Sequence, residues 1–340
     1  MCVHKKNLII PVFIPHAGCP HKCAFCNQKT ITHVNSKLPS QKQLQSRIQE
    51  FLKYKSPKHN KVQISFYGGN FLGLQHDDIQ YLLTQASSFI DSGDVDSLRF
   101  STRPDTITPE NLNVLNDFKV SAIELGVQSM DNRVLELSKR GHTALDTKKA
   151  VHLLKERGYE TGLQMMTGLP GDTPEKAMNT GHKLVELLPD FVRIYPAVVL
   201  ENSLLAKLYR DGKYCPMPVD ECVTLVKKLY LLFTQNNIPV IRMGLQSSLE
   251  LDSGTAVLAG PYHPAFGHMV YSEIFLDKVI AKLKLLPGLE KTVSIAVHPA
   301  NVSRLQGLKN RNIEILKKMF HIEAVKIIQN SAVSKADVII

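Results

Sequence analysis

The chain has 340 residues, a hydrophobic content of 44% and a net charge of +10 at pH 7. This length can bury one large core, or one core and a small second domain. No stretch of about 18 apolar residues occurs, which argues against a membrane-spanning helix. The first residues, Met-Cys-Val-His-Lys-Lys, lack the apolar segment of a secretory signal. We therefore expect a cytoplasmic protein with no membrane partner.

The positive charge is concentrated at the two ends of the chain. Residues 1–61 carry eleven Lys or Arg against one acidic residue, and residues 281–340 carry ten against four. The stretch between them is net negative. This distribution favours an anionic partner, and RNA bound through the basic N- and C-terminal regions is the leading candidate. Lysines on solvated helix faces would produce the same pattern.

Apolar, β-rich segments alternate with helical ones along the first 200 residues. Strands are predicted at 7–15, 62–68, 97–102, 122–128, 160–167 and 191–199. Helices are predicted near 40–54, 76–90, 109–117, 131–157 and 174–188. Six such repeats imply parallel strands joined by right-handed crossovers. The predicted fold class is α/β, as a partial (β/α)6 barrel.

The pattern loosens after residue 200. Helices are predicted at 203–211, 219–236 and 269–285, with a strand at 239–244. A small basic unit at 292–340 has the pattern strand, helix (about 303–320), strand. We expect a barrel domain over 1–245 and, over 246–340, a C-terminal extension that contains the small α/β unit.

Three cysteines, Cys19, Cys23 and Cys26, follow the first predicted strand with the spacing C-x3-C-x2-C. Three thiolates on one loop can hold three irons of a cubane cluster, whereas a cluster held entirely by protein takes four. One iron would then be open to another ligand, which is typical of a reactive site.

Other chemistry fits the same spacing. Zinc accepts cysteines at C-x2-C, and His16 or His21 would complete a tetrahedral set, although no second C-x2-C occurs. A disulfide framework is less consistent with six cysteines in 340 residues. Inert thiols are the third alternative.

Polar and glycine residues follow most of the other predicted strands. The second strand leads into Gly68-Gly69-Asn70, the third into Arg103-Pro-Asp105, the fourth into Gln128-Ser129, and the fifth into Gly168-Leu-Pro-Gly171. In an α/β barrel, function is located at the carboxyl ends of the strands. Packing alone would not concentrate such residues there, so we place the cysteines in an active site.

With these residues assembled, the chain resembles the radical S-adenosylmethionine (SAM) superfamily. Phe25 matches the aromatic residue that usually precedes the last cysteine of its motif. Gly68-Gly69-Asn70 resembles the Gly-Gly element that contacts the methionyl amino group. Asn70 stands where the family usually has Glu or Thr, and its amide can accept a hydrogen bond but supplies no charge.

A closer resemblance, over residues 7–245, is to the radical domain of the catalytic subunit of Elongator and its short bacterial relatives. The matching phrases are Ser101-Thr-Arg-Pro-Asp105, Ile123-Glu-Leu-Gly-Val-Gln-Ser129, Arg140-Gly-His-Thr143, Ile194-Tyr-Pro196 and the run from Leu204 to Tyr214. The run Gly168–Thr173 also resembles oxygen-independent coproporphyrinogen oxidases. No acetyltransferase domain is recognisable, and the last 100 residues show no Elongator counterpart, so acetyl transfer is not carried over.

The resemblance implies a 4Fe–4S cluster on the three cysteines and SAM at its open iron. A low-potential electron donor would reduce the cluster, and reductive cleavage of SAM would give a radical that abstracts hydrogen from a substrate. Site residues implied by the resemblance are Gln128 and Ser101 at the ribose, Arg140 at the methionyl carboxylate, Gln164 as a further cofactor contact, and Arg103 at the cofactor or an anionic substrate.

Several of the residues named in the resemblance also have a structural explanation. Arg140 is suited to a helix C-terminus, and Arg103 to an ion pair with Asp105. Gly68 and Gly69 are suited to a tight turn, and Gln128 to capping a strand end.

Several other residues have no assigned role. Cys2, Cys215 and Cys222 would be a second cluster or incidental thiols. His263 and His268 lie in a stretch rich in Gly and Pro, and either bind substrate or support a loop. Basic residues of 303–320 would contact phosphates or simply face solvent.

Three functions therefore remain open. They are a radical enzyme acting on RNA, a radical enzyme acting on a small or porphyrin-like metabolite, and a non-catalytic nucleic-acid-binding protein stabilised by zinc or a cluster. The sequence does not identify the substrate.

Overall fold

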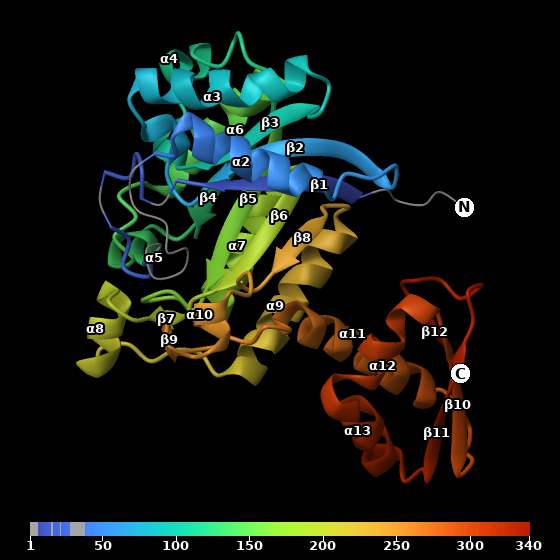
Figure 1. The fold of residues 1–340 in the computed structure, drawn as a ribbon. Coiled ribbons are helices and arrows are strands. Elements are labelled where there is room, and N and C mark those ends of the chain that lie inside the picture. Colours follow the sequence, from blue (N-terminus) through green and yellow to red (C-terminus); the bar gives the residue numbers. More distant parts are fainter. Residues whose placement is uncertain (1–5, 15, 21, 28–37) are drawn as a thin grey trace.

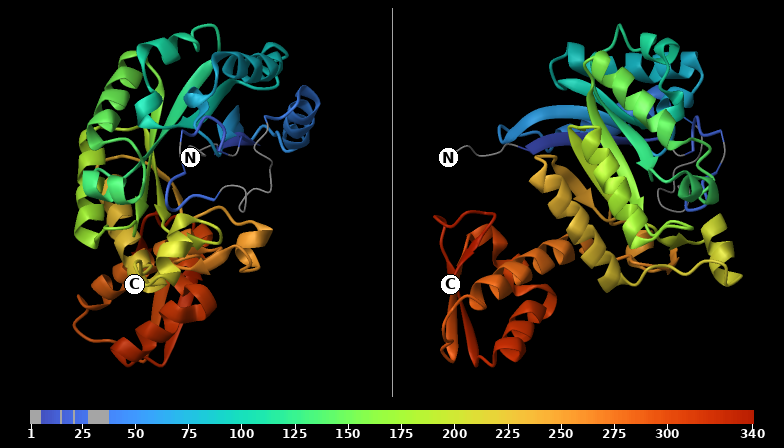
Figure 2. Two further views of the ribbon diagram at one scale, coloured as in Figure 1. Left: turned by 90° about the vertical axis from the view of Figure 1, so that its left-hand side faces the viewer. Right: turned by 180° about the vertical axis from the view of Figure 1, so that it is seen from behind.

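The computed structural model describes residues 6–14, 16–20, 22–27 and 38–340. Its central feature is a parallel sheet of seven strands in the order β1-β2-β3-β4-β5-β6-β8 (Figure 1). The strands are β1 Lys6–Phe13, β2 His59–Tyr67, β3 Ser97–Thr102, β4 Val120–Gln128, β5 Glu160–Thr167, β6 Phe191–Pro196 and β8 Val240–Met243. The sheet curls into a half-barrel with its helices on the outer face (Figure 2). The predicted α/β partial barrel is confirmed.

The helices of the half-barrel follow the strands in the expected alternation. They are α2 Gln41–Leu52, α3 His76–Asp91, α4 Pro109–Asn113, α5 Asn132–Leu137, α6 Ala144–Glu156, α7 Pro174–Glu186, α8 Leu204–Arg210 and α9 Val219–Gln235. Side-chain caps explain several starting points. Ser40 and Gln43 form a capping box at α2, and the Thr108 and Thr173 hydroxyls accept from backbone N–H groups at the starts of α4 and α7.

Two predicted elements differ from the structure. The helix predicted at 131–157 is two helices, α5 and α6, because Lys139 and Gly141 adopt positive φ angles of 52° and 71° between them. The strand predicted at 191–199 ends at Pro196, and a short strand β7 (Val199–Leu200) follows.

The strand predicted at 239–244 belongs to the barrel, although it was not counted among its six strands. It is β8, and it pairs in parallel with β6. Short strand β7 pairs instead with β9 (Val257–Ala259), outside the main sheet, and α10 (Leu249–Asp252) lies between β8 and β9.

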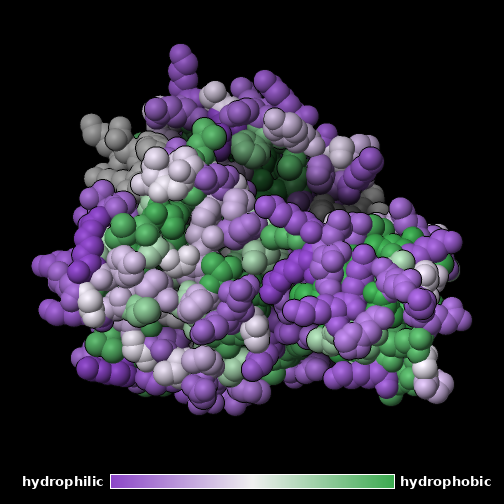
Figure 3. All heavy atoms as spheres, turned by 90° about the horizontal axis from the view of Figure 1, so that it is seen from below, coloured by the Kyte–Doolittle hydropathy of each residue, from purple (hydrophilic) through white to green (hydrophobic). Residues whose placement is uncertain are grey.

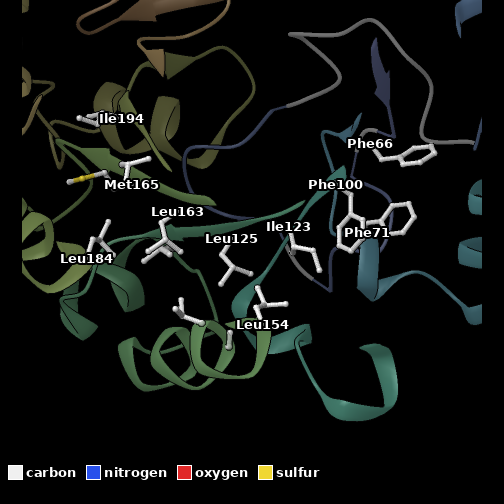
Figure 4. Close-up of a cluster of buried hydrophobic side chains, with 14 of the residues drawn as sticks. Phe66, Phe71, Phe100, Ile123, Leu125, Leu154, Leu163, Met165, Leu184 and Ile194 are labelled. Atoms are coloured by element: carbon white, nitrogen blue, oxygen red, sulfur yellow. The ribbon is translucent and has the colours of Figure 1, made fainter. Parts of the chain in front are cut away.

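The main core lies between the sheet and the outer helices. Because successive side chains of a strand point to opposite faces, alternate apolar residues are directed outward. Figure 4 shows Leu125 and Leu163 facing Leu154 of α6. Farther along, the rings of Phe71 and Phe100 stack with centroids 4.4 Å apart. Each fully buried side chain of this size contributes about 1.5–3 kcal/mol of hydrophobic stabilisation.

A smaller unit follows at the C-terminus. It contains a three-stranded sheet of order β11-β10-β12 and two helices. The elements are β10 Thr292–Val297, α12 Val302–Gln306, α13 Arg311–Phe320, β11 Ala324–Gln329 and β12 Val338–Ile339. The helix predicted at 303–320 is therefore interrupted. The break falls where Gly307, Lys309 and Asn310 have positive φ angles.

Helix α11 (Phe266–Leu283) joins the two parts of the molecule (Figure 1). Its first half, including Phe266 and Ile274, packs in the core of the half-barrel. Its second half, from Phe275 to Leu283, packs in the core of the C-terminal unit. The cores thus divide within α11, beyond the predicted boundary at residue 245, and the division of the chain into folding units stays a prediction.

Among the described residues, no helix combines the length and the apolar character needed to cross a membrane.

Candidate active site

The loop that carries Cys19, Cys23 and Cys26, called the cysteine loop below, is attached by backbone hydrogen bonds to the turn that follows β2. The His16 N–H donates to the Gly68 carbonyl at 2.9 Å, and the Asn70 N–H donates to the Ala17 carbonyl at 2.9 Å. A Cβ atom at Gly69 would lie 2.6 Å from the Ala17 carbonyl oxygen. Gly68 has a φ of 89°, a conformation that glycine adopts without strain. The Gly-Gly pair therefore allows two backbone segments to approach closely.

The Asn70 side chain holds this turn together from inside. It is fully buried, and its Nδ2 donates to the Gly18 carbonyl at 2.9 Å. Its Oδ1 accepts from the Thr102 hydroxyl at 2.7 Å, the Arg103 backbone N–H at 3.0 Å and the Thr106 hydroxyl at 3.0 Å. The predicted contact of this amide with the cofactor would require some of these bonds to be given up, so the structure favours a positioning role.

The second half of the loop is attached to the opposite side of the barrel mouth. The Ala24 N–H donates to the Ser138 carbonyl at 2.9 Å, and the Ala24 carbonyl accepts from the Leu205 N–H at 2.8 Å. Phe25 packs against two small buried clusters, one that includes Met166 of β5 and one that includes Leu205 of α8. The loop therefore lies across the carboxyl ends of the strands.

Cys23 is buried, and Cys19 and Cys26 are half-buried. The Arg140 guanidinium contacts Cys23, with Nη1 3.0 Å from Sγ, and its Nη2 donates to the Gly126 carbonyl at 2.6 Å. Burial, followed by the neighbouring Cys23, raises the pKa of Cys19, whereas the positive charges of Arg103 and Arg140 lower it.

These features fit a thiolate-ligated iron–sulfur cluster, since three sulfur donors share one loop beside two cationic side chains. Within the described residues, no three His, Cys, Asp or Glu side chains are arranged to hold a metal ion. His21, one candidate zinc ligand, lies outside the described residues, as does Cys2. Ligation by the three cysteines stays a prediction.

Gln128 and Arg140 converge over Gly126 at the end of β4. A Cβ atom at Gly126 would lie 3.1 Å from Gln128 Nε2 and 3.3 Å from Arg140 Nη2. Gln128 has a φ of 68°, in the left-handed region, and its buried Oε1 accepts no hydrogen bond within the described part of the chain. A strained residue with an unsatisfied buried acceptor is common at ligand sites.

His142 lies in the same region and was not singled out from the sequence as a site residue. Its Nε2 is 3.2 Å from the Val127 carbonyl, and its buried Nδ1 has no hydrogen-bond partner among the described residues. Burial, followed by the charge of Arg140, lowers the pKa of His142 to about 4. The ring is therefore neutral at pH 7.

A charged network fills the interior of the half-barrel. Glu124 is fully buried, and its carboxylate lies 2.6 Å from Arg99 Nη2 and 2.6 Å from Arg193 Nε. It also accepts from the Tyr67 hydroxyl at 3.1 Å. Burial alone would raise the pKa of Glu124, but Arg193 and Arg99 outweigh it and hold the pKa below its ordinary value.

Sequence reasoning did not single out this network. The signal was the strand alternation: Arg99, Glu124 and Arg193 each occupy an alternate position between apolar residues that face outward. Charged residues at inward positions of three strands, β3, β4 and β6, would have predicted a polar interior.

The network brings together two residues predicted to bind the cofactor. Gln164 Nε2 donates to the Ser101 hydroxyl at 3.3 Å and to Glu124 Oε2 at 3.2 Å. Because the amide nitrogen is used in this way, Gln164 Oε1 is the atom available to a ligand donor.

Arg103 is buried and makes a two-point ion pair with Asp105, at 2.9 Å and 2.7 Å. The predicted alternative, an ion pair between Arg103 and Asp105, is thus confirmed. A contact of Arg103 with cofactor or substrate stays a prediction.

Cys215, Cys222 and His263, which had no role assigned from the sequence, lie in different surroundings. Cys222 is buried in α9, its thiol 3.7 Å from the Thr167 hydroxyl, whereas Cys215 is exposed. Burial raises the pKa of Cys222 to about 12. His263 Nδ1 accepts from the Ala265 N–H at 3.0 Å, which gives it a loop-supporting role.

Comparison with protein families decides the assignment. A family model described as the radical SAM superfamily matches residues 13–184, which include the cysteine loop and strands β2 to β5 of the half-barrel. The chain belongs to the radical SAM superfamily. A second model, described as a radical SAM C-terminal domain, matches residues 189–275 of this radical SAM protein.

Two curated relatives come from Methanocaldococcus jannaschii. The uncharacterized protein MJ0486 is 30% identical over 234 residues, which cover 65% of this chain and 70% of that protein. A tRNA uridine(34) acetyltransferase is 26% identical over 318 residues, covering 82% and 57%. The radical SAM chain spans about half the length of the acetyltransferases that it matches.

Among solved structures, Elp3 of Methanocaldococcus infernus with an N-terminal deletion is similar, with a TM-score of 0.62 and 21% identity. The match covers 83% of this chain and 64% of that one. Both this match and the acetyltransferase alignment cover more of the radical SAM chain than the stretch 7–245. The expectation that the last 100 residues have no Elongator counterpart is therefore wrong for part of that region.

Proposed function

We propose that this radical SAM protein is an enzyme that cleaves SAM reductively and abstracts hydrogen from an RNA substrate. Cys19, Cys23 and Cys26 would hold a 4Fe–4S cluster at the barrel mouth. The observation that carries the proposal is the contact of Arg140 with Cys23, which joins the cysteine loop to the Gly126–Gln128 end of β4.

When bound, the cluster and SAM supply one-electron chemistry that the protein itself lacks. The protein's residues bind and orient. Gln128 Oε1 and Gln164 Oε1 are acceptors suited to the ribose hydroxyls of SAM. Arg140 is the cation suited to its methionyl carboxylate, since a guanidinium and a carboxylate match in charge and geometry.

The interior network adjoins this site, because Glu124 accepts a hydrogen bond from Gln164. Glu124 links β4 to Arg99 on β3 and Arg193 on β6, and all three side chains are at least largely buried. Fixed charges of this kind occupy space that water would otherwise fill. Exclusion of water protects a reactive species from side reactions.

RNA is favoured as the substrate by charge and by relatives. The C-terminal residues 281–340 carry ten Lys or Arg against four acidic residues. Several relatives are named tRNA uridine(34) acetyltransferase. Because the chain matches about half of their length, the proposal covers their radical chemistry and not transfer of an acetyl group.

The test is SAM cleavage by protein reconstituted with iron and sulfide under anaerobic conditions. Dithionite serves as reductant, and 5′-deoxyadenosine is followed by chromatography. Cys23→Ala is the inactive variant, and Cys215→Ala is its matched control because Cys215 is exposed and outside the loop. We expect product from the wild type and the control, and none from Cys23→Ala.

Two results would contradict the proposal. Protein that binds zinc and no iron would support a non-catalytic zinc protein. Product formation that is stimulated by a porphyrin and not by RNA would favour the metabolite alternative suggested by the Gly168–Thr173 run.

A further inference from the structure

A cavity lies away from the cysteine loop, where the half-barrel meets the C-terminal unit. It has a volume of about 420 Å³ and is bounded by the carboxyl end of β8, the first turns of α11, and α12. Its polar and aromatic lining comes from Arg242, Gln246, Ser247, His268, Tyr271 and Arg304. None of the described residues that line it is acidic.

The two arginines of this cavity are not neutralised by the protein. Within the described part of the chain, neither Arg242 nor Arg304 forms an ion pair with a carboxylate. The Arg304 guanidinium lies 4.0 Å from the centre of the Tyr271 ring, and its Nη1 donates to Asn301 Oδ1 at 3.0 Å. Ring and amide fix its orientation and leave its charge uncompensated.

The positive field reaches His268 as well. Burial, followed by the charge of Arg304, lowers the pKa of His268. A neutral ring can still donate or accept one hydrogen bond at each nitrogen, according to its tautomer. The cavity thus offers two cations together with neutral hydrogen-bonding groups.

Two glycines, Gly244 directly after β8 and Gly267 in the first turn of α11, shape this cavity. Gly244 has a φ of 82°, and a Cβ atom there would lie 2.9 Å from Phe266 Cβ. A Cβ atom at Gly267 would lie 3.2 Å from the Met243 carbonyl oxygen. These glycines let the start of α11 approach the end of β8, and the approach brings His268 and Tyr271 beside Arg242.

The cavity is on the same edge of the sheet as the cysteine loop. All seven strands are parallel, so the carboxyl end of β8 and the carboxyl end of β1, which leads into the loop, lie at one edge. The face of the molecule seen in Figure 3 is mainly hydrophilic, with a hollow above its centre. A long ligand could therefore occupy the barrel mouth and this cavity together.

We propose that the cavity formed by Arg242, His268 and Arg304 is a phosphate-binding site. This inference deepens the proposed function and rests on it, because an RNA substrate would supply the phosphate as a backbone diester. Arginine is the side chain best matched to phosphate, and arginine–phosphate pairs position a nucleic acid without reading its sequence. A free nucleotide carries the same chemistry and is distinguished by the test.

The experiment measures binding of a fluorescein-labelled single-stranded RNA by anisotropy, and of adenosine monophosphate by calorimetry, to the reconstituted protein. The variants are Arg304→Met and Arg242→Met, which keep the proposal testable if one of them folds poorly. The matched control is Arg157→Met. Arg157 is exposed at the end of α6, at the opposite edge of the sheet, and like Arg304 it donates to an asparagine Oδ1.

We expect each cavity variant to weaken RNA binding by about tenfold or more, as loss of a hydrogen bond to a charged group does. The slope of log K against log salt should become shallower by about 0.7 for each phosphate of a single strand that the variant no longer neutralises. Arg157→Met should bind as the wild type does. Loss of nucleotide binding with unchanged RNA binding would keep the phosphate site and assign it to a free nucleotide.

Unchanged binding of both ligands in both cavity variants would overturn the inference, as would a wild type that binds neither ligand. SAM cleavage by the wild type is measured on the same preparations, so that failure of the proposed function is seen separately from loss of phosphate binding. A wild type without cleavage activity whose RNA binding still depends on Arg304 would refute the proposed function and leave the phosphate site standing.

Discussion

The Nη1 atom of Arg140 lies 3.0 Å from the Sγ atom of Cys23, although the two residues are 117 positions apart in the sequence. The same guanidinium donates to the Gly126 carbonyl at 2.6 Å. One side chain therefore connects the cysteine loop to the end of β4. A lysine has the charge of arginine but not its planar fork, so it cannot reproduce this pair of directed contacts.

Arg140→Lys should lower the rate of SAM cleavage by about tenfold to hundredfold, since it removes a hydrogen bond to a charged group. Iron content should stay close to that of the wild type, because Arg140 is not itself a ligand. The measurement is 5′-deoxyadenosine formation per iron, with Arg133→Lys, a change at an exposed side chain of α5, as the control. An undiminished rate in Arg140→Lys would show that the fork has no role in the reaction.

Glu124→Gln should lower the free energy of unfolding by about 3–5 kcal/mol, because it leaves Arg99 and Arg193 buried without their counter-charge. The measurement is urea unfolding at pH 7. Glu136→Gln is the control, since its ion pair with Arg133 is exposed and such pairs contribute at most about 1 kcal/mol. Equal losses in the two variants would contradict a stabilising role for the interior network.

The lowered pKa of Glu124 predicts how the stability of the protein changes with pH. The pKa of this carboxylate is lower in the folded protein than the ordinary value of 4.5. The stabilisation is therefore complete above about pH 4.5 and is lost as the pH falls through the lowered pKa. In acid titrations, wild type and Glu124→Gln should converge in stability at low pH.

Gly69→Ala should displace the cysteine loop, because the added Cβ would lie 2.6 Å from two backbone carbonyl oxygens, those of Ile14 and Ala17. Overpacking of this kind costs about 1–3 kcal/mol. We expect less iron bound per chain after reconstitution. Gly288→Ala is the control, since a Cβ there meets no atom within 4 Å, and matching iron contents in the two variants would argue against the close approach at Gly69.

Asp172→Asn should make the protein more stable above about pH 6. Burial raises the pKa of Asp172 from 3.8 to about 6, although its carboxylate accepts from the Gly168 N–H at 2.9 Å. A raised carboxyl pKa means that stability falls as the pH rises from about 4 to about 6. Asparagine keeps an acceptor for Gly168 and carries no charge. Thermal unfolding midpoints of the two proteins should diverge across this interval, and parallel curves would refute the assignment.

Cys215 should react with iodoacetamide in the native protein, and Cys222 only after unfolding. Cys215 is exposed, whereas Cys222 is buried and burial raises its pKa to about 12, which leaves almost no thiolate at pH 8. Mass spectrometry of peptides after timed alkylation separates the two. Equal protection of both thiols in reconstituted protein would instead support a second cluster.

The half-barrel was predictable because two patterns are clear in the sequence. Its strands are continuous apolar segments, and several of its helices begin at recognisable capping residues. The segments 97–102 and 160–167 coincide with β3 and β5. The break between α5 and α6 was missed because Lys139, which adopts a positive φ, is not a residue type that marks a turn. β8 was found as a strand but not placed in the barrel, since strand pairing depends on contacts that no local pattern reveals.

The site was predictable only in part. The spacing of the three cysteines and the glycines at Gly68 and Gly69 pointed to the loop and its turn. The engagement of the Asn70 amide with four protein groups could not be read from a motif. The same holds for the cavity at Arg242 and Arg304, whose two arginines are 62 positions apart and belong to different parts of the molecule.

Helix α11 supplies apolar side chains to both cores, with the change falling between Ile274 and Phe275. The half-barrel and the C-terminal unit should therefore unfold in a single calorimetric transition. If α11 unfolded in one core, the apolar side chains that it buries in the other core would become exposed as well. The C-terminal unit would then stabilise β8 against thermal unfolding. A ligand held at Arg304 would raise the melting temperature of the whole chain rather than that of one lobe.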